Sequence, residues 1–173
     1  MKLQKAQLCK CLFVLGISLI VLLALSPAFA APKTLHGLIT LYGFPDNSPP
    51  GNGIAFPIIH SGAGGKGTNA DPITFATAPA EHKPGTRVYV TAFQKYFIME
   101  DECVACDGDW ANGHHRHIDL WTNSNAHSNF SKVIACEDTL TQSNGTFILN
   151  PATNLKVSSK PLYSDSNGGT CFH

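Results

Sequence analysis

Charged side chains are scarce in this chain, since only 14% of its 173 residues are Asp, Glu, Lys or Arg. Beyond the first 30 positions, the chain carries nine basic and twelve acidic residues, a net charge of −3 with neutral histidine. A slightly acidic domain does not attract the phosphates of nucleic acid or an anionic membrane surface. We therefore expect neither as a partner. Few charges and many Gly, Pro, Ser, Thr and Asn residues favour a loop-rich β domain with a neutral or polar ligand, such as a glycan.

The chain also lacks an apolar run long enough for a membrane-spanning helix. Its apolar run at 12–25 is shorter than the roughly 20 residues that such a helix needs. Three lysines precede this run and the small-residue pattern Ala28-Phe29-Ala30 follows it, which is the three-part architecture of a secretory signal peptide. We predict a cleavable signal peptide at 1–30, with a retained anchor as the alternative. The mature protein is then secreted, extracellular or periplasmic, without membrane contact.

Cysteine is sparse in the predicted mature domain, 31–173, which has the length of one domain. It holds four: Cys103, Cys106, Cys136 and Cys171. An even number in an exported chain indicates two disulfides, and three pairings are open. We expect Cys171 to tie the C-terminal tail to the body. A zinc site is the alternative, because Cys103-x-x-Cys106 is followed by His114, His115 and His117. Export favours disulfides, so we predict no metal and no other cofactor.

Helical periodicity is nearly absent, and short segments with a period of two dominate. Only one brief helix is expected, within 128–135. Turn signals rich in glycine and proline separate the segments, and this spacing favours a closed or nearly closed β-barrel. The predicted strands are 35–42, 54–59, 73–76, 86–91, 93–99 and 117–121.

Several short segments resemble, in their order, one group of known proteins. They are Thr40-Leu-Tyr42, Asp71 to Ala76, Pro84 to Val90, Asp101 near a cysteine, and His117-Ile-Asp-Leu120. Across residues 35–140 this order resembles double-psi β-barrel proteins: the expansins, the family 45 endoglucanases and the three-aspartate domain of bacterial membrane-bound lytic transglycosylases. The resemblance implies an all-β fold, a small six-stranded double-psi β-barrel with long loops, stapled by disulfides.

The resemblance also implies an acid at the cleft of the barrel. His117-Ile118-Asp119-Leu120 resembles the His-Phe-Asp-Leu signature of expansins and family 45 enzymes, whose aspartate is the general acid in the hydrolases. The last of the three aspartates of the transglycosylase domain corresponds to the same Asp119. Since glycosidic cleavage needs a proton donor and usually a second carboxylate, we predict Asp119 and Asp101 as catalytic residues. The residues predicted to bind substrate are Tyr42, Asp71, His117 and Trp121.

Each of these residues has a structural alternative. Asp119 could cap a loop, Asp101 could lie in a solvated acidic turn, and Asp71 could begin a turn before proline. Tyr42 and Trp121 could belong to the core. His117 could be part of a solvated run of histidines.

The leading hypothesis is a secreted, monomeric, polysaccharide-active protein of the cell wall. It would cleave peptidoglycan or a cellulose-like glucan by acid catalysis from Asp119, as a glycoside hydrolase or a lytic transglycosylase. A second hypothesis is a non-catalytic, expansin-like module that binds glycan or loosens the wall without turnover. A third is an exported interaction or effector protein that uses the barrel as a scaffold.

Overall fold

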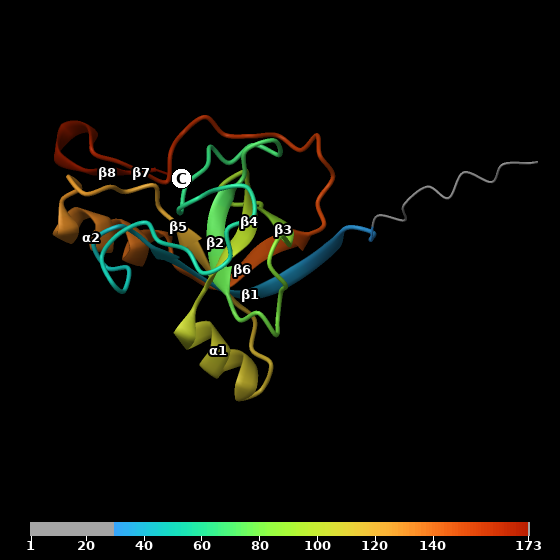
Figure 1. Ribbon diagram of the computed structural model, residues 1–173. Coiled ribbons are helices and arrows are strands. Elements are labelled where there is room, and N and C mark those ends of the chain that lie inside the picture. Colours follow the sequence, from blue (N-terminus) through green and yellow to red (C-terminus); the bar gives the residue numbers. More distant parts are fainter. Residues whose placement is uncertain (1–29, 173) are drawn as a thin grey trace, which may run out of the picture.

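The computed structural model describes residues 30–172, so the predicted signal peptide lies, up to residue 29, outside the described residues (Figure 1). Six strands of this part close into a barrel in the order β1-β5-β2-β4-β3-β6. Their bounds are β1 Lys33–Tyr42, β2 Ile73–Thr77, β3 Arg87–Val90, β4 Lys95–Glu102, β5 His117–Trp121 and β6 Gln142–Leu149. The predicted fold class, a small six-stranded barrel of mainly β structure with disulfides, is confirmed.

Two α-helices accompany the barrel in residues 30–172: α1 (Val104–Ala111) packs against β5, and α2 (Phe130–Leu140) packs against β1. In Figure 1, α1 projects from one end of the barrel. A small sheet of β7 (Tyr163–Ser164) and β8 (Thr170–Cys171), joined by the 3-10 turn η1 (Ser166–Gly168), lies near the C-terminus. Within the described range no helix has the length and apolar character that crossing a membrane requires.

Successive side chains of a strand point to opposite faces, and strand β5 shows what each face carries. On β5, Ile118 and Leu120 are fully buried, whereas His117 and Asp119 share the opposite face. The filled core includes Phe75, Phe97 and other large apolar side chains. Because one face of each strand supplies the core, the other face is free to carry polar groups.

Strand register places four residues in one row across adjacent strands. Thr40 on β1 is paired with Asp119 on β5, and Asp119 is paired with Ala76 on β2. Ala76 in turn is paired with Asp101 on β4. This row therefore brings together two carboxylates that are far apart in the sequence.

A register shift between β2 and β4 completes this row. Phe75 is paired with Met99, but the next residue, Ala76, is paired with Asp101, so Glu100 is the extra residue of a β-bulge. Bulges are common beside functional sites because they re-aim a side chain. Without this bulge, Ala76 would oppose Glu100.

The predicted strand at 54–59 is wrong, because this segment is a loop. Its backbone amides find another acceptor: the N–H groups of Ile58, Ile59 and His60 donate to one carboxylate oxygen of Glu100 at 2.7–3.2 Å. A buried carboxylate thus replaces the neighbouring strand that a sheet would supply.

The other elements differ from the predictions mainly in length. The brief helix expected within 128–135 is α2, which begins after Asn129, whose side chain accepts from the N–H of Lys132 at 3.1 Å. Helix α1 and strand β6 were not predicted, since both contain glycine within a polar sequence.

The four cysteines form two disulfides, Cys103–Cys106 and Cys136–Cys171. The second joins α2 to β8 and so ties the C-terminal tail to the barrel, as predicted. The sequence alone had left the pairing open.

Removing the Cys136–Cys171 disulfide destabilises the protein. The bond spans 35 residues, and closing a loop of this size restricts the unfolded chain by about 3 to 4 kcal/mol. We expect the double substitution Cys136→Ala and Cys171→Ala to lower the free energy of unfolding by about this amount, measured by urea denaturation. The matched pair Cys103→Ala and Cys106→Ala, whose bond spans three residues, is the control. Equal losses from both pairs would contradict the loop-closure explanation.

Candidate functional site

Asp119 lies in an environment that favours its protonated form. Its Oδ1 accepts a hydrogen bond of 2.7 Å from Thr40 Oγ1, the residue paired with it on β1. Burial raises the pKa of the Asp119 carboxyl to about 7, opposed by the Thr40 hydrogen bond and reinforced by the negative charges of Asp46 and Asp101. Asp119 can therefore hold or release a proton near neutral pH, as a general acid must.

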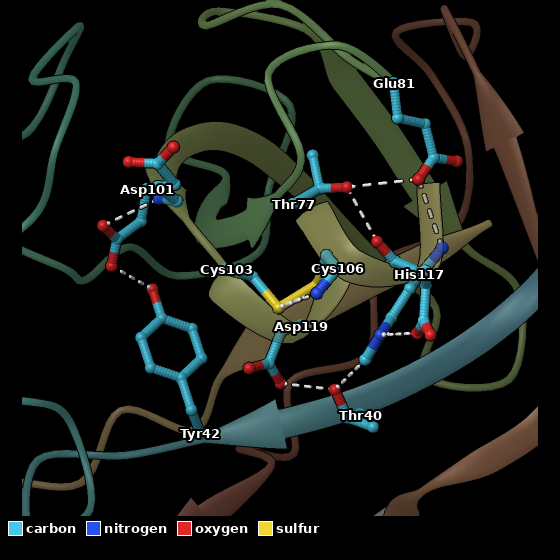
Figure 2. Close-up of a disulfide and its surroundings, with 11 residues drawn as sticks. Thr40, Tyr42, Thr77, Glu81, Asp101, Cys103, Cys106, His117 and Asp119 are labelled. Atoms are coloured by element: carbon cyan, nitrogen blue, oxygen red, sulfur yellow. Dashed lines mark hydrogen bonds and ion pairs between the residues drawn. A yellow bond between two sulfur atoms is a disulfide. The ribbon is translucent and has the colours of Figure 1, made fainter. Parts of the chain in front are cut away.

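A chain of hydrogen bonds extends from Asp119 to helix α1 (Figure 2). Thr40 Oγ1 also lies 2.8 Å from His117 Nε2, and His117 Nδ1 lies 2.8 Å from Asp109 Oδ2. His117 is buried, with 5% of its surface exposed, so it is not part of a solvated run of histidines. Its ring is instead fixed on both sides beside the candidate acid.

Asp101 is held as a hydrogen-bond acceptor. The hydroxyl of Tyr42 donates to Oδ2 at 3.0 Å, and the backbone N–H groups of Ala55 and Glu102 each donate to Oδ1 at 2.9 Å. Three donors suit an ionised carboxylate, which only accepts. Among the described residues Asp119 has a single such donor, Thr40, so the two carboxylates have different hydrogen-bond environments.

Tyr42 lies between these two carboxylates, as Figure 2 shows. Burial, followed by the charges of Asp101 and Asp119, raises the pKa of the Tyr42 hydroxyl well above its usual value. Tyr42 therefore keeps its proton and positions Asp101.

Trp121 does not have the position predicted for it. It is 2% exposed, and its ring packs edge-on against Tyr42 with ring centroids 5.2 Å apart. A ring this buried offers no face for stacking on a sugar. Trp121 contributes to the site only by supporting Tyr42.

Asp71 belongs to a different cluster. Its Oδ1 lies 3.1 Å from His60 Nε2, and His60 Nδ1 lies 2.6 Å from Glu100 Oε2. Burial lowers the pKa of His60, but hydrogen bonds to Glu100 and Asp71 outweigh it and raise the pKa overall. Asp71 thus holds the long loop before β2 in place. Among the described residues it makes no hydrogen bond or ion pair with Asp101 or Asp119.

Among the acidic residues near the site that the sequence analysis missed are Glu137 and Asp46. Glu137 on α2 is 6% exposed, and burial, then the charges of Asp46 and Asp119, raise its pKa to about 9. Asp46 accepts from the N–H of Gly43 at 2.8 Å, in the loop after β1. Neither residue lies in a recognisable motif, so no sequence signal identified them.

One group of residues has the composition of a metal site. Donor atoms of Cys103, Cys106 and His117 lie within 4.8 Å of one another, although the two sulfurs are bonded to each other. His114 and His115, which the zinc alternative also included, are exposed.

Comparison with known proteins finds a matching family model and a similar protein. The family model described as "DDB_G0273701 N-terminal domain" matches residues 34–172. A Dictyostelium discoideum protein named "Uncharacterized protein DDB_G0273701/DDB_G0273221" is 40% identical over 139 residues, which are 80% of this chain and 60% of that protein. The chain therefore spans less than two thirds of its relative's length. No solved structure matches.

Proposed function

We propose that this chain, which belongs to the family of the DDB_G0273701 N-terminal domain, is a secreted protein that cleaves a cell-wall polysaccharide by acid catalysis from Asp119. The observation that carries the proposal is the cross-strand row that places Asp119, part-buried and held by Thr40, on the same face of the sheet as Asp101. Burial also raises the pKa of Asp119 to about 7. At neutral pH a large fraction of such a group is protonated and can donate to a leaving glycosidic oxygen.

Asp101 supplies the second carboxylate of this mechanism. It lies in the same cross-strand row as Asp119, two strands away, which is about 10 Å along the sheet at the usual strand spacing. Inverting glycosidases hold their carboxyl groups about 6.5 to 9.5 Å apart, whereas retaining enzymes hold them about 5 Å apart. In an inverting mechanism Asp101 would activate a water molecule, and in a retaining mechanism it would attack the sugar. A lytic transglycosylase would use Asp119 alone.

The test measures soluble sugar released from peptidoglycan and amorphous cellulose by the exported chain. We expect release by the wild type and a fall of about 10²- to 10⁴-fold in the Asp119→Asn variant, because a general acid contributes a factor of this size. Asp138→Asn, an exposed aspartate next to Glu137, is the matched control and keeps full activity. Release that survives Asp119→Asn would rule out this residue as the acid.

A non-catalytic, expansin-like module is the second candidate. Hollows of about 520 Å³ and 830 Å³ on the described surface are lined by other residues, and neither includes Asp101 or Asp119. Such a module needs no enclosed cleft at Asp119, because it binds along the polymer without turnover. Binding to either polysaccharide without release of sugar would support this candidate, and neither binding nor release would support an interaction or effector protein.

A further inference from the structure

The Cys103–Cys106 disulfide lies beside a histidine rather than in a purely apolar setting. Cys103 and Cys106 bracket the first turn of α1, and His117 begins β5, with the donor atoms of all three within 4.8 Å of one another. Figure 2 shows the sulfurs and the imidazole close together, next to Thr40 and Asp119. The three residues are only 8%, 0% and 5% exposed, respectively.

Two soft sulfur donors and one imidazole are a ligand set that Zn²⁺ prefers. The surroundings fit such a site on the sulfur side, because Cys103 caps α1 and its Sγ accepts a hydrogen bond of 3.1 Å from the N–H of Cys106. Outer hydrogen bonds of this kind orient ligands and tune a bound metal.

The surroundings fit on the imidazole side as well. A histidine that binds a metal almost always uses its other ring nitrogen for a hydrogen bond to an outer partner. His117 has such a partner on each side, Asp109 Oδ2 and Thr40 Oγ1, both at 2.8 Å. Whichever nitrogen binds the metal, the other keeps a partner that fixes the ring.

We propose that Cys103, Cys106 and His117 form a redox-gated zinc site. In the oxidised chain the disulfide excludes the metal. A dithiol reductant passes two electrons to the disulfide, its own two sulfurs become a disulfide, and two cysteine thiols form. On binding Zn²⁺ the thiols release their protons, and the two thiolates and one nitrogen of His117 become ligands. Three protein ligands leave the fourth position to water.

The experiment uses the full exported chain and two metal probes. The oxidised chain and a chain reduced with a phosphine are each titrated with Zn²⁺, and then with Co²⁺, whose thiolate charge-transfer band reports sulfur ligands. We expect the reduced chain to bind one metal ion with this band, and the oxidised chain to bind none.

Substitutions separate this site from the other cysteines. The variant carrying Cys103→Ser and Cys106→Ser still contains Cys136 and Cys171, and we expect it to lose the metal and the band after reduction. His117→Ala should weaken metal binding at least about tenfold. Loss of a residue that only supports a metal ligand typically has an effect of this size, and loss of the ligand itself should cost no less. His114→Ala, on an exposed histidine of the same connection, should not.

Three results would overturn the site. The first is that the reduced wild type binds no metal, and the second is that His117→Ala and His114→Ala bind the metal with the same affinity. The third is that reduction abolishes the circular dichroism of the barrel, because only the folded barrel holds His117 beside α1. Each is independent of glycan cleavage, so failure here does not decide the proposed function.

Discussion

The Glu137→Gln variant becomes more stable than the wild type as pH rises. Glu137 has its pKa raised from 4.5 to about 9, mainly by burial. Between these values the folded state retains a proton that the unfolded state has lost, so rising pH favours unfolding of the wild type. Glutamine has no proton to lose and keeps a donor toward Asp46.

The size of this effect follows from proton linkage. Each pH unit between about 4.5 and 9 removes on the order of 1 kcal/mol from the stability of the wild type through this one group. Asp119 acts in the same direction up to about pH 7. By pH 8 the free energy of unfolding of Glu137→Gln therefore exceeds that of the wild type by several kcal/mol. Above pH 7, neither Glu137 nor Asp119 should change the stability of this variant much further.

Urea denaturation at pH 5, 7 and 9 measures this difference. Asp138→Asn is the comparison, because it removes an exposed carboxyl from the adjacent position of α2. Its charge is the smallest of the causes that raise the pKa of Glu137, so this variant should change the pH dependence far less than Glu137→Gln does. If Glu137→Gln and the wild type lost stability in parallel from pH 5 to pH 9, Glu137 would not be protonated in the folded protein.

The Trp121→Ala substitution has the second large effect. Trp121 is among the largest fully buried side chains, and truncating a buried aromatic residue costs about 3 to 5 kcal/mol. It also removes the edge-on support of Tyr42, which positions Asp101. We therefore expect loss of both stability and site geometry.

Thermal unfolding and glycan binding of two tryptophan variants test this interpretation. Trp110→Ala is the matched control, because Trp110 is only partly buried at the edge of the core. The burial of Trp121 argues against a role in stacking on sugar. That role would be supported instead if Trp121→Ala kept the melting temperature of the wild type but lost its affinity for glycan.

The parts of the fold that the sequence predicts are those with strong local patterns. The alternation of His117 to Trp121 identified β5, and the β-branched and aromatic residues near Tyr89 identified β3. The loop at 54–59 was mistaken for a strand because its apolar residues resemble one. The partner of its amides, Glu100, is more than 40 positions away.

The site was predicted only in part for the same reason. Asp101, Asp119, Tyr42 and His117 lie in one region of the barrel, because strand pairing brings together residues that the sequence keeps apart. Asp71 does not join them, since its neighbour His60 holds it in a loop clamp. Glu137 and Asp46 show no local signal, because their importance arises only from burial among other carboxylates.

Because of the bulge in β4, the neighbouring residues Glu100 and Asp101 point into different surroundings and make different contacts. Glu100 anchors the loop through three backbone amides and His60, whereas Asp101 lies in the cross-strand row with Asp119. If a sequence alignment with a relative were shifted by one position, the residue equivalent to Glu100 would be taken for the one equivalent to Asp101. A one-residue deletion in β4 would remove the bulge, so the shortened strand could not place one carboxylate on the loop and another in the row. We therefore expect a change in length between Met99 and Cys103 to disrupt both contacts at once.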